Sequence, residues 1–450
     1  MLCLRDATVR ASEIPAQHSA LPLAPRLDGE LLYDNAARHT AANDWGHYVH
    51  NPPVAVLRPA SVTDVSRIVR YANQRRLTVA VRGQGHCVHG QAQAGSGIVI
   101  DSSRLNAIGW HGNDQLDAQP GALWGAVATT ALERSLIPPV MPDALMLSIG
   151  GTLSAGGTGQ TSCGSGAQVD HVLELDVVTG HGDLVTCSPA RSEELFRMVL
   201  AGLGQCGLIV RARLRLVHAT PYVLVRTLTC DDSDALISDH VRLATSDGPP
   251  VLVGEVTKDA GGRWRFVSLS GTFAERPEDE RTPEATRMSY WDYLDRRTAS
   301  VAATKARGTP NPSLAVTLPE RSVRPFLAHA LADPEASAGI WRIEVIPMIT
   351  ARFTQPLHVI PEGALAFTLR LQRRASAENA ADHKAMLTSN RTLVQRCLDA
   401  GGKVYPPFAP VLSPEDWRRH YGAATWQRFA AAKDRFDPNH VLTPGVGVFA

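Results

Sequence analysis

A histidine enclosed by glycines is the residue of this sequence best placed to do chemistry. His86 lies in the segment 81–91, directly after a β-branched run, 77–81, that predicts a buried strand. Gly83 and Gly85 flank the turn before it and permit close approaches that a Cβ atom would block. Backbone N–H groups at the end of such a strand can hold a phosphate group. The loop is therefore predicted to press its backbone against a ligand.

A second segment is also rich in small residues and backbone donors. The stretch 148–159 holds five glycines in twelve residues, together with Ser148, Ser154 and Thr158. We expect it to be an irregular segment that is ordered only by wrapping around a ligand or by tight packing of its neighbours. Two donor loops with little nearby lysine suit a large cofactor that contains a pyrophosphate group.

The residues of the first loop leave several roles open. The run Gly83-Gln84-Gly85 lacks the third glycine of a dinucleotide fingerprint, and no Gly-Lys-Ser/Thr of a Walker A loop follows it. His86, Cys87 and His89 could instead bind a metal, although no second pair of ligands stands out. A buried core histidine is the leading explanation from the loop alone.

Length and composition narrow the class of protein. The chain has 450 residues, of which 44% are apolar and 20% charged, and this predicts a soluble globular protein of two domains. Its formal charge of +1 gives no reason to expect a nucleic acid or a membrane surface as partner. The seven cysteines are odd in number and scattered, so we expect reduced thiols and a cytoplasmic location. No transmembrane segment or secretory signal is expected.

Periodicity predicts the elements that position the two loops. The strand 54–57, a helix that begins with a capping box at Ser61 and Asp64, and the strand 77–81 form a β-α-β unit. A helix over 121–136, a hairpin of 172–178 with 184–186, a helix over 193–201 and a strand near 210–216 follow. Residues 1–30 are predicted to be a loosely attached arm.

The pattern changes after about His218. Strands are predicted over 251–256, 264–270, 340–345 and 364–371, and helices over 233–245, 290–305 and 377–400, while a further helix near 414–433 belongs to the tail. Gly401 and Gly402 are expected to end the third of these helices. This part is predicted to be an antiparallel sheet covered by helices.

Several segments together resemble the cytokinin dehydrogenases. The run 83–87, with Gly90-Gln91-Ala92-Gln93, closely resembles the flavin-attachment loop of these enzymes, which belong to the vanillyl-alcohol-oxidase family with a PCMH-type FAD-binding domain. The resemblance continues through Asp143 and several later segments in the same order. These are 150–154, 173–180, 184–188, 202–207, Tyr405-Pro406, Trp417 and 437–445.

The resemblance implies the cofactor and the residues that hold it. His86 stands where the family's histidine is joined through a ring nitrogen to the 8α-methyl carbon of FAD, one per chain. Other positions that match the family's FAD-binding residues are Gly83, Gln84, Gly85, Cys87, Gln91, Ser148, Ser154, Thr158, Ile209, Tyr405 and Thr443. No metal site is expected.

The resemblance also implies a catalytic base and leaves the substrate open. Asp143 matches the aspartate that accepts a proton from the substrate amine as hydride leaves the adjacent carbon, and an aspartate that caps its loop is the alternative. The glutamate that the family contributes from its substrate domain has no clear match, and Glu255 and Glu344 are distant candidates. Cys163 could form a second bond to FAD, but its surroundings do not match that motif.

These observations predict an α+β protein of two domains. Residues 1–220 and 403–450 form a PCMH-type FAD-binding domain, and 221–402 form an antiparallel-sheet substrate domain covered by helices. The expected function is transfer of hydride from a C–H bond next to nitrogen or oxygen to covalently bound FAD, which oxygen or another acceptor reoxidises. The substrate is a small molecule, and tailoring of a secondary metabolite, cytokinin-type amine oxidation and ligand sequestration for resistance are the alternatives.

Overall fold

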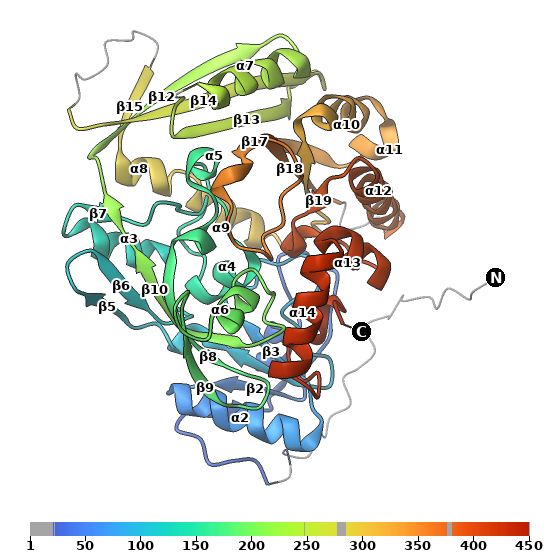
Figure 1. The fold of residues 1–450 in the computed structure, drawn as a ribbon. Coiled ribbons are helices and arrows are strands. Elements are labelled where there is room, and N and C mark those ends of the chain that lie inside the picture. Colours follow the sequence, from blue (N-terminus) through green and yellow to red (C-terminus); the bar gives the residue numbers. More distant parts are fainter. Residues whose placement is uncertain (1–20, 22, 247, 277–284, 376–379, 450) are drawn as a thin grey trace.

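The chain builds two regions of sheet that face each other across a set of short helices (Figure 1). The computed structural model describes residues 21, 23–246, 248–276, 285–375 and 380–449. The lower region in Figure 1 contains two sheets from the first half of the chain, and the upper region contains one larger sheet.

A four-stranded sheet carries the loop of His86. Its strands, in the order β1-β2-β4-β3, are β1 (Glu30–Leu32), β2 (Ala55–Arg58), β4 (Ile98–Asp101) and β3 (Val79–Arg82). Both β2 and β3 pair in parallel with β4, which lies between them. The helix α2 (Val62–Arg75) connects β2 to β3, and the capping box of Ser61 and Asp64 starts it as predicted. The helix α1 (Asn35–Ala41) precedes β2.

A five-stranded antiparallel sheet carries the second half of this region. Its order is β5 (Ile108–His111), β6 (Gln115–Ala118), β10 (Leu208–Arg215), β8 (Val172–Val178) and β9 (Leu184–Cys187). The predicted hairpin is β8 with β9. The helices are α3 (Trp124–Leu132), α4 (Ile149–Ala155), α5 (Ser162–Ser165) and α6 (Glu193–Val199), and a short pair joins β7 (Leu136–Ile137) to β11 (Val217–His218).

The upper region is an eight-stranded antiparallel sheet. Its order is β15 (Ala285–Ser289), β12 (Tyr222–Cys230), β14 (Trp264–Ala274), β13 (Val251–Lys258), β17 (Ile340–Ile349), β18 (Leu365–Arg373), β16 (Leu314–Pro319) and β19 (Lys403–Val404). The helices α7 (Ser233–Thr245), α10 (Glu320–Ala332), α11 (Pro334–Ser337) and α12 (Ala380–Asp399) pack outside it, while α5 of the lower region contacts β13 and β17. The sheet is therefore covered by its own helices on one side and meets the lower region on the other.

The end of the chain returns to the lower region. The helices α13 (Pro414–Tyr421) and α14 (Ala423–Phe436) run down one side of the molecule in Figure 1, and α14 contacts α6. The segment after α14 then lies against β3, where the Val79 N–H donates to Val441 O at 2.7 Å and the Thr443 N–H donates to Val79 O at 2.7 Å. A segment close to the C-terminus is thereby brought next to the strand that leads into the His86 loop.

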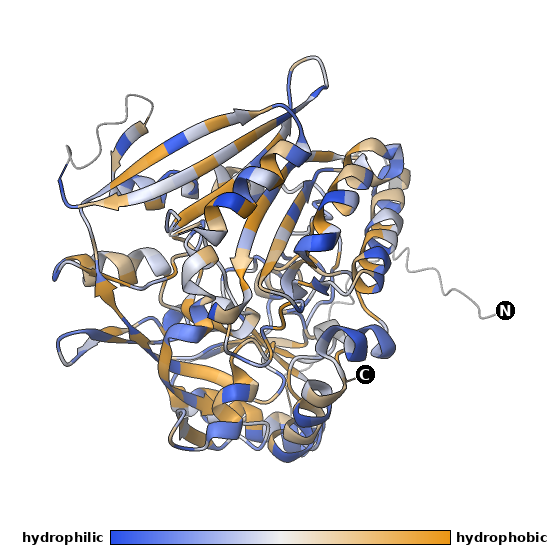
Figure 2. Cartoon of the chain, turned by 45° about the horizontal axis from the view of Figure 1, so that its top comes forward, coloured by the Kyte–Doolittle hydropathy of each residue, from blue (hydrophilic) through white to orange (hydrophobic). Residues whose placement is uncertain are grey.

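Burial follows the predicted periodicity, but five predicted segments differ from the structure. Apolar residues gather along the strands (Figure 2), and the buried residues of α2 are mostly apolar. The helix expected over 290–305 is two helices, α8 (Tyr290–Asp295) and α9 (Thr298–Ala306), and the one over 414–433 is broken at Gly422, whose φ is +76°. The helix expected over 121–136 begins only at Trp124 and ends at Leu132.

The other differences concern two segments expected to be irregular. Residues 149–155 of the glycine-rich stretch form the regular helix α4, and its glycines serve close packing: a Cβ atom on Gly150 would lie 2.6 Å from the Cβ of Pro120. The arm predicted over 1–30 lies outside the described residues for 1–20 and 22. Its end is attached, since the Asp28 and Gly29 N–H groups donate to the buried carboxylate of Asp64.

Candidate functional site

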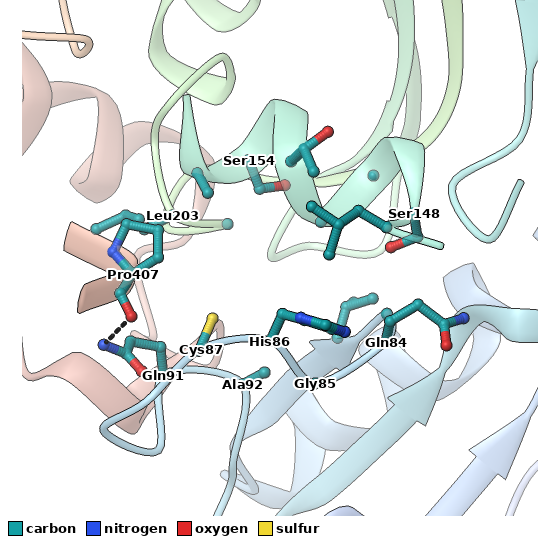
Figure 3. A pocket seen from close by; sticks show the side chains of 18 of the residues that line it. Gln84, Gly85, His86, Cys87, Gln91, Ala92, Ser148, Ser154, Leu203 and Pro407 are labelled. Carbon is teal, nitrogen blue, oxygen red and sulfur yellow. Dashed lines mark hydrogen bonds between the residues drawn. The ribbon is translucent and has the colours of Figure 1, made fainter. Parts of the chain in front are cut away.

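A long cavity lies between the His86 loop and the helix α4. Its empty volume is about 1140 Å³. Figure 3 shows the loop on one side, Ser148 and Ser154 across from it, and open space between them. The sequence-predicted residues that line it are Gly83, Gln84, Gly85, His86, Cys87, Gln91, Ser148, Ser154, Ile209, Tyr405 and Thr443. The fold thus brings together five segments that are far apart in the sequence.

Close backbone contacts shape this cavity. A Cβ atom on Gly83 would lie 2.1 Å from the Ser148 Oγ, so a larger residue there would force Ser148 to move. The Gln91 amide donates to the carbonyls of Pro406 at 3.0 Å and Pro407 at 3.2 Å, which ties the loop to the end of the chain (Figure 3). Gln91 Oε1 also accepts from the His89 N–H at 2.8 Å. The cavity wall is therefore fixed by hydrogen bonds within the protein.

The His86 side chain is partly buried, and no hydrogen bond holds its ring. Its Nε2 is buried and has no partner, and its ring stacks on Trp45 with the ring centres 4.8 Å apart. Burial, and then the nearby charges of Lys305 and Arg82, lower the pKa of His86 to about 3. The imidazole is therefore neutral at physiological pH, as a nitrogen nucleophile must be.

A second cavity adjoins the first one. Its empty volume is about 1070 Å³, and it lies between the two regions of the fold. Residues that line both cavities are His86, Leu147, Thr152, Tyr405 and Phe408. A molecule in the second cavity would therefore contact the His86 end of a molecule in the first.

Asp143 lines this second cavity, and one of its oxygens makes no hydrogen bond. Its Oδ2 accepts from Arg370, while its buried Oδ1 has no hydrogen-bond partner and lies 4.0 Å from Arg297 Nη1. Arg370 also donates to Glu344 at 3.3 Å and to the Thr158 hydroxyl at 2.7 Å. Thr158 therefore lines the second cavity rather than the first, unlike the other predicted FAD-binding residues.

Glu344 anchors the arginines of this wall. Burial opposes its charge, but Arg297, Arg342 and Arg370 outweigh that effect and hold the pKa of Glu344 well below its usual range. Its Oε1 accepts from Arg297, and its Oε2 accepts from Arg370. The carboxylate is therefore used to orient guanidinium groups and is not free to take a proton.

Sequence reasoning missed most of this wall. Trp45, Arg297, Trp341, Arg342 and Arg370 line the second cavity, yet none of them belongs to a recognisable motif. Glu344 was considered only as a distant candidate. The position of Glu344 in the apolar strand 340–349 could have indicated its role, because an acidic side chain buried in such a strand needs cationic partners.

Comparison with known proteins decides the family. Residues 53–188 match the FAD binding domain, and residues 281–449 match the domain described as cytokinin dehydrogenase 1, FAD and cytokinin binding. A protein of Rhodococcoides fascians named uncharacterized oxidoreductase ORF5 in fasciation locus is 34% identical over 92% of this chain and 97% of its own length. Cytokinin dehydrogenase 8 of Oryza sativa subsp. indica is 32% identical over 91% of each chain. The chain belongs to the cytokinin dehydrogenase family of FAD-dependent oxidoreductases.

As a member of this family, the protein uses FAD, and the first cavity fits it. The cavity is large, is lined by backbone and small side chains, and carries an unpartnered imidazole at the end that meets the second cavity. Cys163, the candidate for a second bond, lies in α5 and is not among the described residues that line either cavity. Burial, followed by Asp44, raises the pKa of Cys87 to about 12, so this thiol stays protonated.

Other outcomes concern metals and membranes. Among the described residues, no three His, Cys, Asp or Glu side chains gather as a metal site would require. His89 Nδ1 makes a hydrogen bond with the Tyr48 hydroxyl at 2.5 Å, and this bond gives the ring a structural partner. Among the residues that the structure describes, no helix has both the length and the apolar character needed to span a bilayer.

Proposed function

We propose that this protein oxidises a small molecule at a C–H bond beside an N–H or O–H group, with Asp143 as the proton acceptor and His86 as the covalent anchor of FAD. The observation that carries the proposal is that Asp143 Oδ1 has no hydrogen-bond partner and that Asp143 lines a cavity which shares His86 with the FAD cavity. Bound FAD supplies an acceptor for hydride, and dioxygen or another acceptor reoxidises it. The residues of the chain bind and orient the substrate and accept its proton.

Asp143 is suited to hold and take a proton at one atom. Because Oδ2 already accepts a hydrogen bond from Arg370, Oδ1 is the oxygen that can accept one from the N–H or O–H group of the substrate. Arg370 is itself fixed by Thr158 and Glu344, so the carboxylate has a defined orientation. Burial of the site excludes water and strengthens these electrostatic interactions. Asp143 is therefore a general base whose geometry is set before the substrate binds.

The same wall favours certain substrates. Arg297, Arg342 and Arg370 outnumber the two carboxylates of this wall, so its formal charge disfavours a protonated amine. A neutral secondary amine next to an electron-poor ring, or an alcohol, fits better, because each can donate a hydrogen bond to Asp143 without carrying a positive charge. The relatives named cytokinin dehydrogenase favour the amine. Cytokinin-type amine oxidation is therefore the first candidate, and oxidation of an alcohol group, as in tailoring of a secondary metabolite, is the second.

The test is loss of the flavin colour under anaerobic conditions. The purified protein is mixed with an adenine-type cytokinin carrying an allylic side chain, and separately with a panel of primary and secondary alcohols. Bleaching by the cytokinin supports the first candidate, and bleaching by alcohols alone supports the second. If ligands bind, as judged by a shift of the flavin spectrum, but none bleaches it, the protein sequesters its ligand and the proposed oxidation is wrong.

A further inference from the structure

A short segment before β2 holds the loop that carries His86. This segment consists of residues 43–46, which we call the 43–46 clasp, and it lies outside the matched FAD binding domain of residues 53–188. Arg82 donates to the carbonyl of Asn43, and the Trp45 N–H donates to Gly85 O at 2.9 Å. One side-chain hydrogen bond and one backbone hydrogen bond therefore join the clasp to the start of the His86 loop.

Asp44 joins the clasp to the far end of the same loop. Its buried carboxylate accepts from the Gly90 N–H at 2.7 Å and from the Gly46 N–H at 2.9 Å. The fit is close, since a Cβ atom on Gly46 would lie 2.0 Å from the Val88 carbonyl oxygen. The clasp thus spans the loop from Gly85 to Gly90, with His86 between these two points.

Trp45 brings the clasp into contact with the His86 side chain. The two rings stack with an angle of 29° between their planes and 4.8 Å between their centres. The clasp is also held from the other region of the fold, because the Asn311 N–H donates to Gly46 O at 2.9 Å. The Asn311 side chain satisfies its neighbours when its oxygen accepts from the Trp45 indole N–H. In this orientation of the Asn311 amide, the indole is held at its N–H by Asn311 and through its backbone by the contacts of the clasp.

This arrangement matters because no hydrogen bond to the buried Nε2 holds the His86 ring. A ring that can turn about its side-chain bonds presents its nitrogen to a bound cofactor only part of the time. Formation of a covalent bond depends steeply on alignment, and a misplacement of about 1 Å can cost on the order of 10² in rate. Stacking on a fixed indole restricts the rotation that would cause such a misplacement.

We propose that Trp45, held by the 43–46 clasp, is a positioning residue that orients His86 for bond formation with FAD. The inference rests on the covalent attachment proposed above. The reaction joins a ring nitrogen of His86 to the 8α carbon of FAD, and one N–H bond and one C–H bond are broken. Dioxygen takes up the two hydrogens and two electrons and leaves as hydrogen peroxide. Trp45 takes no part in this exchange and acts only through the orientation of the imidazole.

The experiment measures attachment separately from FAD binding. Wild-type protein, Trp45→Ala, Trp45→Phe and the control Trp291→Ala are purified and precipitated with acid, and FAD is measured in the pellet and in the supernatant. Trp291 is 38% exposed on α8 and lines neither cavity. Fluorescence of the denatured protein band gives a second measure of attached flavin. Thermal unfolding shows whether each variant is folded.

The expected result is a redistribution of FAD from pellet to supernatant. In Trp45→Ala the attached fraction falls on the order of tenfold or more, while total FAD per folded chain stays near that of the wild type. Trp45→Phe restores attachment because it retains an aromatic face, and Trp291→Ala behaves as the wild type. If Trp45→Ala does not fold, Trp45→Leu, which fills more of the space without an aromatic ring, takes its place.

Two outcomes would overturn the inference, and they differ. If the wild type attaches FAD and the Ala or Leu variant attaches it equally, Trp45 does not position His86, although the proposed attachment stands. If the wild type itself releases all of its FAD into the supernatant, the attachment is wrong and the role of Trp45 falls with it.

Discussion

Asp143→Asn is the substitution that tests the proposed chemistry most directly. In the wild type, Oδ2 accepts from Arg370 and Oδ1 is free to accept from the substrate. The asparagine has a single acceptor, and we expect it to stay with Arg370 because an amide NH₂ cannot accept from a guanidinium group. The NH₂ group then faces the N–H or O–H group of the substrate, so that two donors meet.

The expected loss combines two effects. Removal of a general base costs about 10²–10⁴ in rate. A buried donor left facing another donor costs about 1–3 kcal/mol, which is about 5-fold to 150-fold. Flavin reduction in Asp143→Asn should therefore be slower by on the order of 10³ or more, with FAD content and thermal stability close to those of the wild type.

The assay is anaerobic stopped-flow mixing with saturating substrate, read as loss of flavin absorbance. A suitable control is Asp183→Asn, because the Asp183 side chain is 64% exposed and pairs only with the exposed Arg70 across the surface. This control should reduce its flavin at the wild-type rate. A rate for Asp143→Asn within about tenfold of the wild type would refute the assignment of Asp143 as the base.

Three further predictions concern stability. Lys433→Met leaves the buried carboxylate of Asp437 without its cation and should cost about 3–5 kcal/mol in urea unfolding. His240→Leu removes a buried ring whose two nitrogens have no partner and whose pKa burial lowers to about 4. The unfolded histidine takes up a proton below about pH 6.5, whereas the folded one does not until about pH 4, so the stability of the wild type decreases as the pH is lowered. The variant lacks this loss. Its free energy of unfolding, relative to that of the wild type, should therefore be about 2 kcal/mol higher at pH 5 than at pH 7.5. Gly150→Ala should lower the melting temperature, because contact with Pro120 costs about 1–3 kcal/mol and outweighs a gain of about 1 kcal/mol in helix propensity.

Each of these predictions has a contrary result. A loss below about 1 kcal/mol in Lys433→Met would mean that Asp437 is neutralised or solvated without the lysine. Equal shifts at pH 5 and pH 7.5 in His240→Leu would show that the ring titrates normally in the folded protein. A higher melting temperature in Gly150→Ala would show that α4 can move away from Pro120.

Local pattern was sufficient for some of the elements around the FAD cavity but not for α4, whose glycines predicted an irregular segment. The capping box at Ser61 and Asp64 and the hairpin of β8 and β9 are set by residues near one another in sequence, and the structure confirms both. The break between α8 and α9 could not be read in the same way. At this break Arg296 reaches Gln160 and Arg297 reaches Glu344, so contacts with distant residues accompany the end of one helix and the start of the next.

The second cavity shows the same limit more clearly. Arg297, Glu344 and Arg370 come from three separate elements, and their spacing in sequence carries no signal of their contact. Trp45 likewise contacts His86 from residues 43–46, a segment that carries no recognisable motif. By contrast, the FAD-binding residues follow from family resemblance, because each lies in a motif with a recognisable sequence. Their individual roles stay predictions.

The composition of the FAD cavity bears on when the cofactor can be attached. Its walls come from the loop after β3, from α4, from residues 203–209 and from residues as late as Thr443. When His86 has just been added to the growing chain, only the first wall of the cavity has been synthesised. About 350 more residues must follow before Thr443 can form its hydrogen bond with β3. The proposed attachment of FAD to His86 is therefore expected to occur only after the chain is complete. Cells short of riboflavin would accumulate full-length protein that is folded less stably and awaits its cofactor.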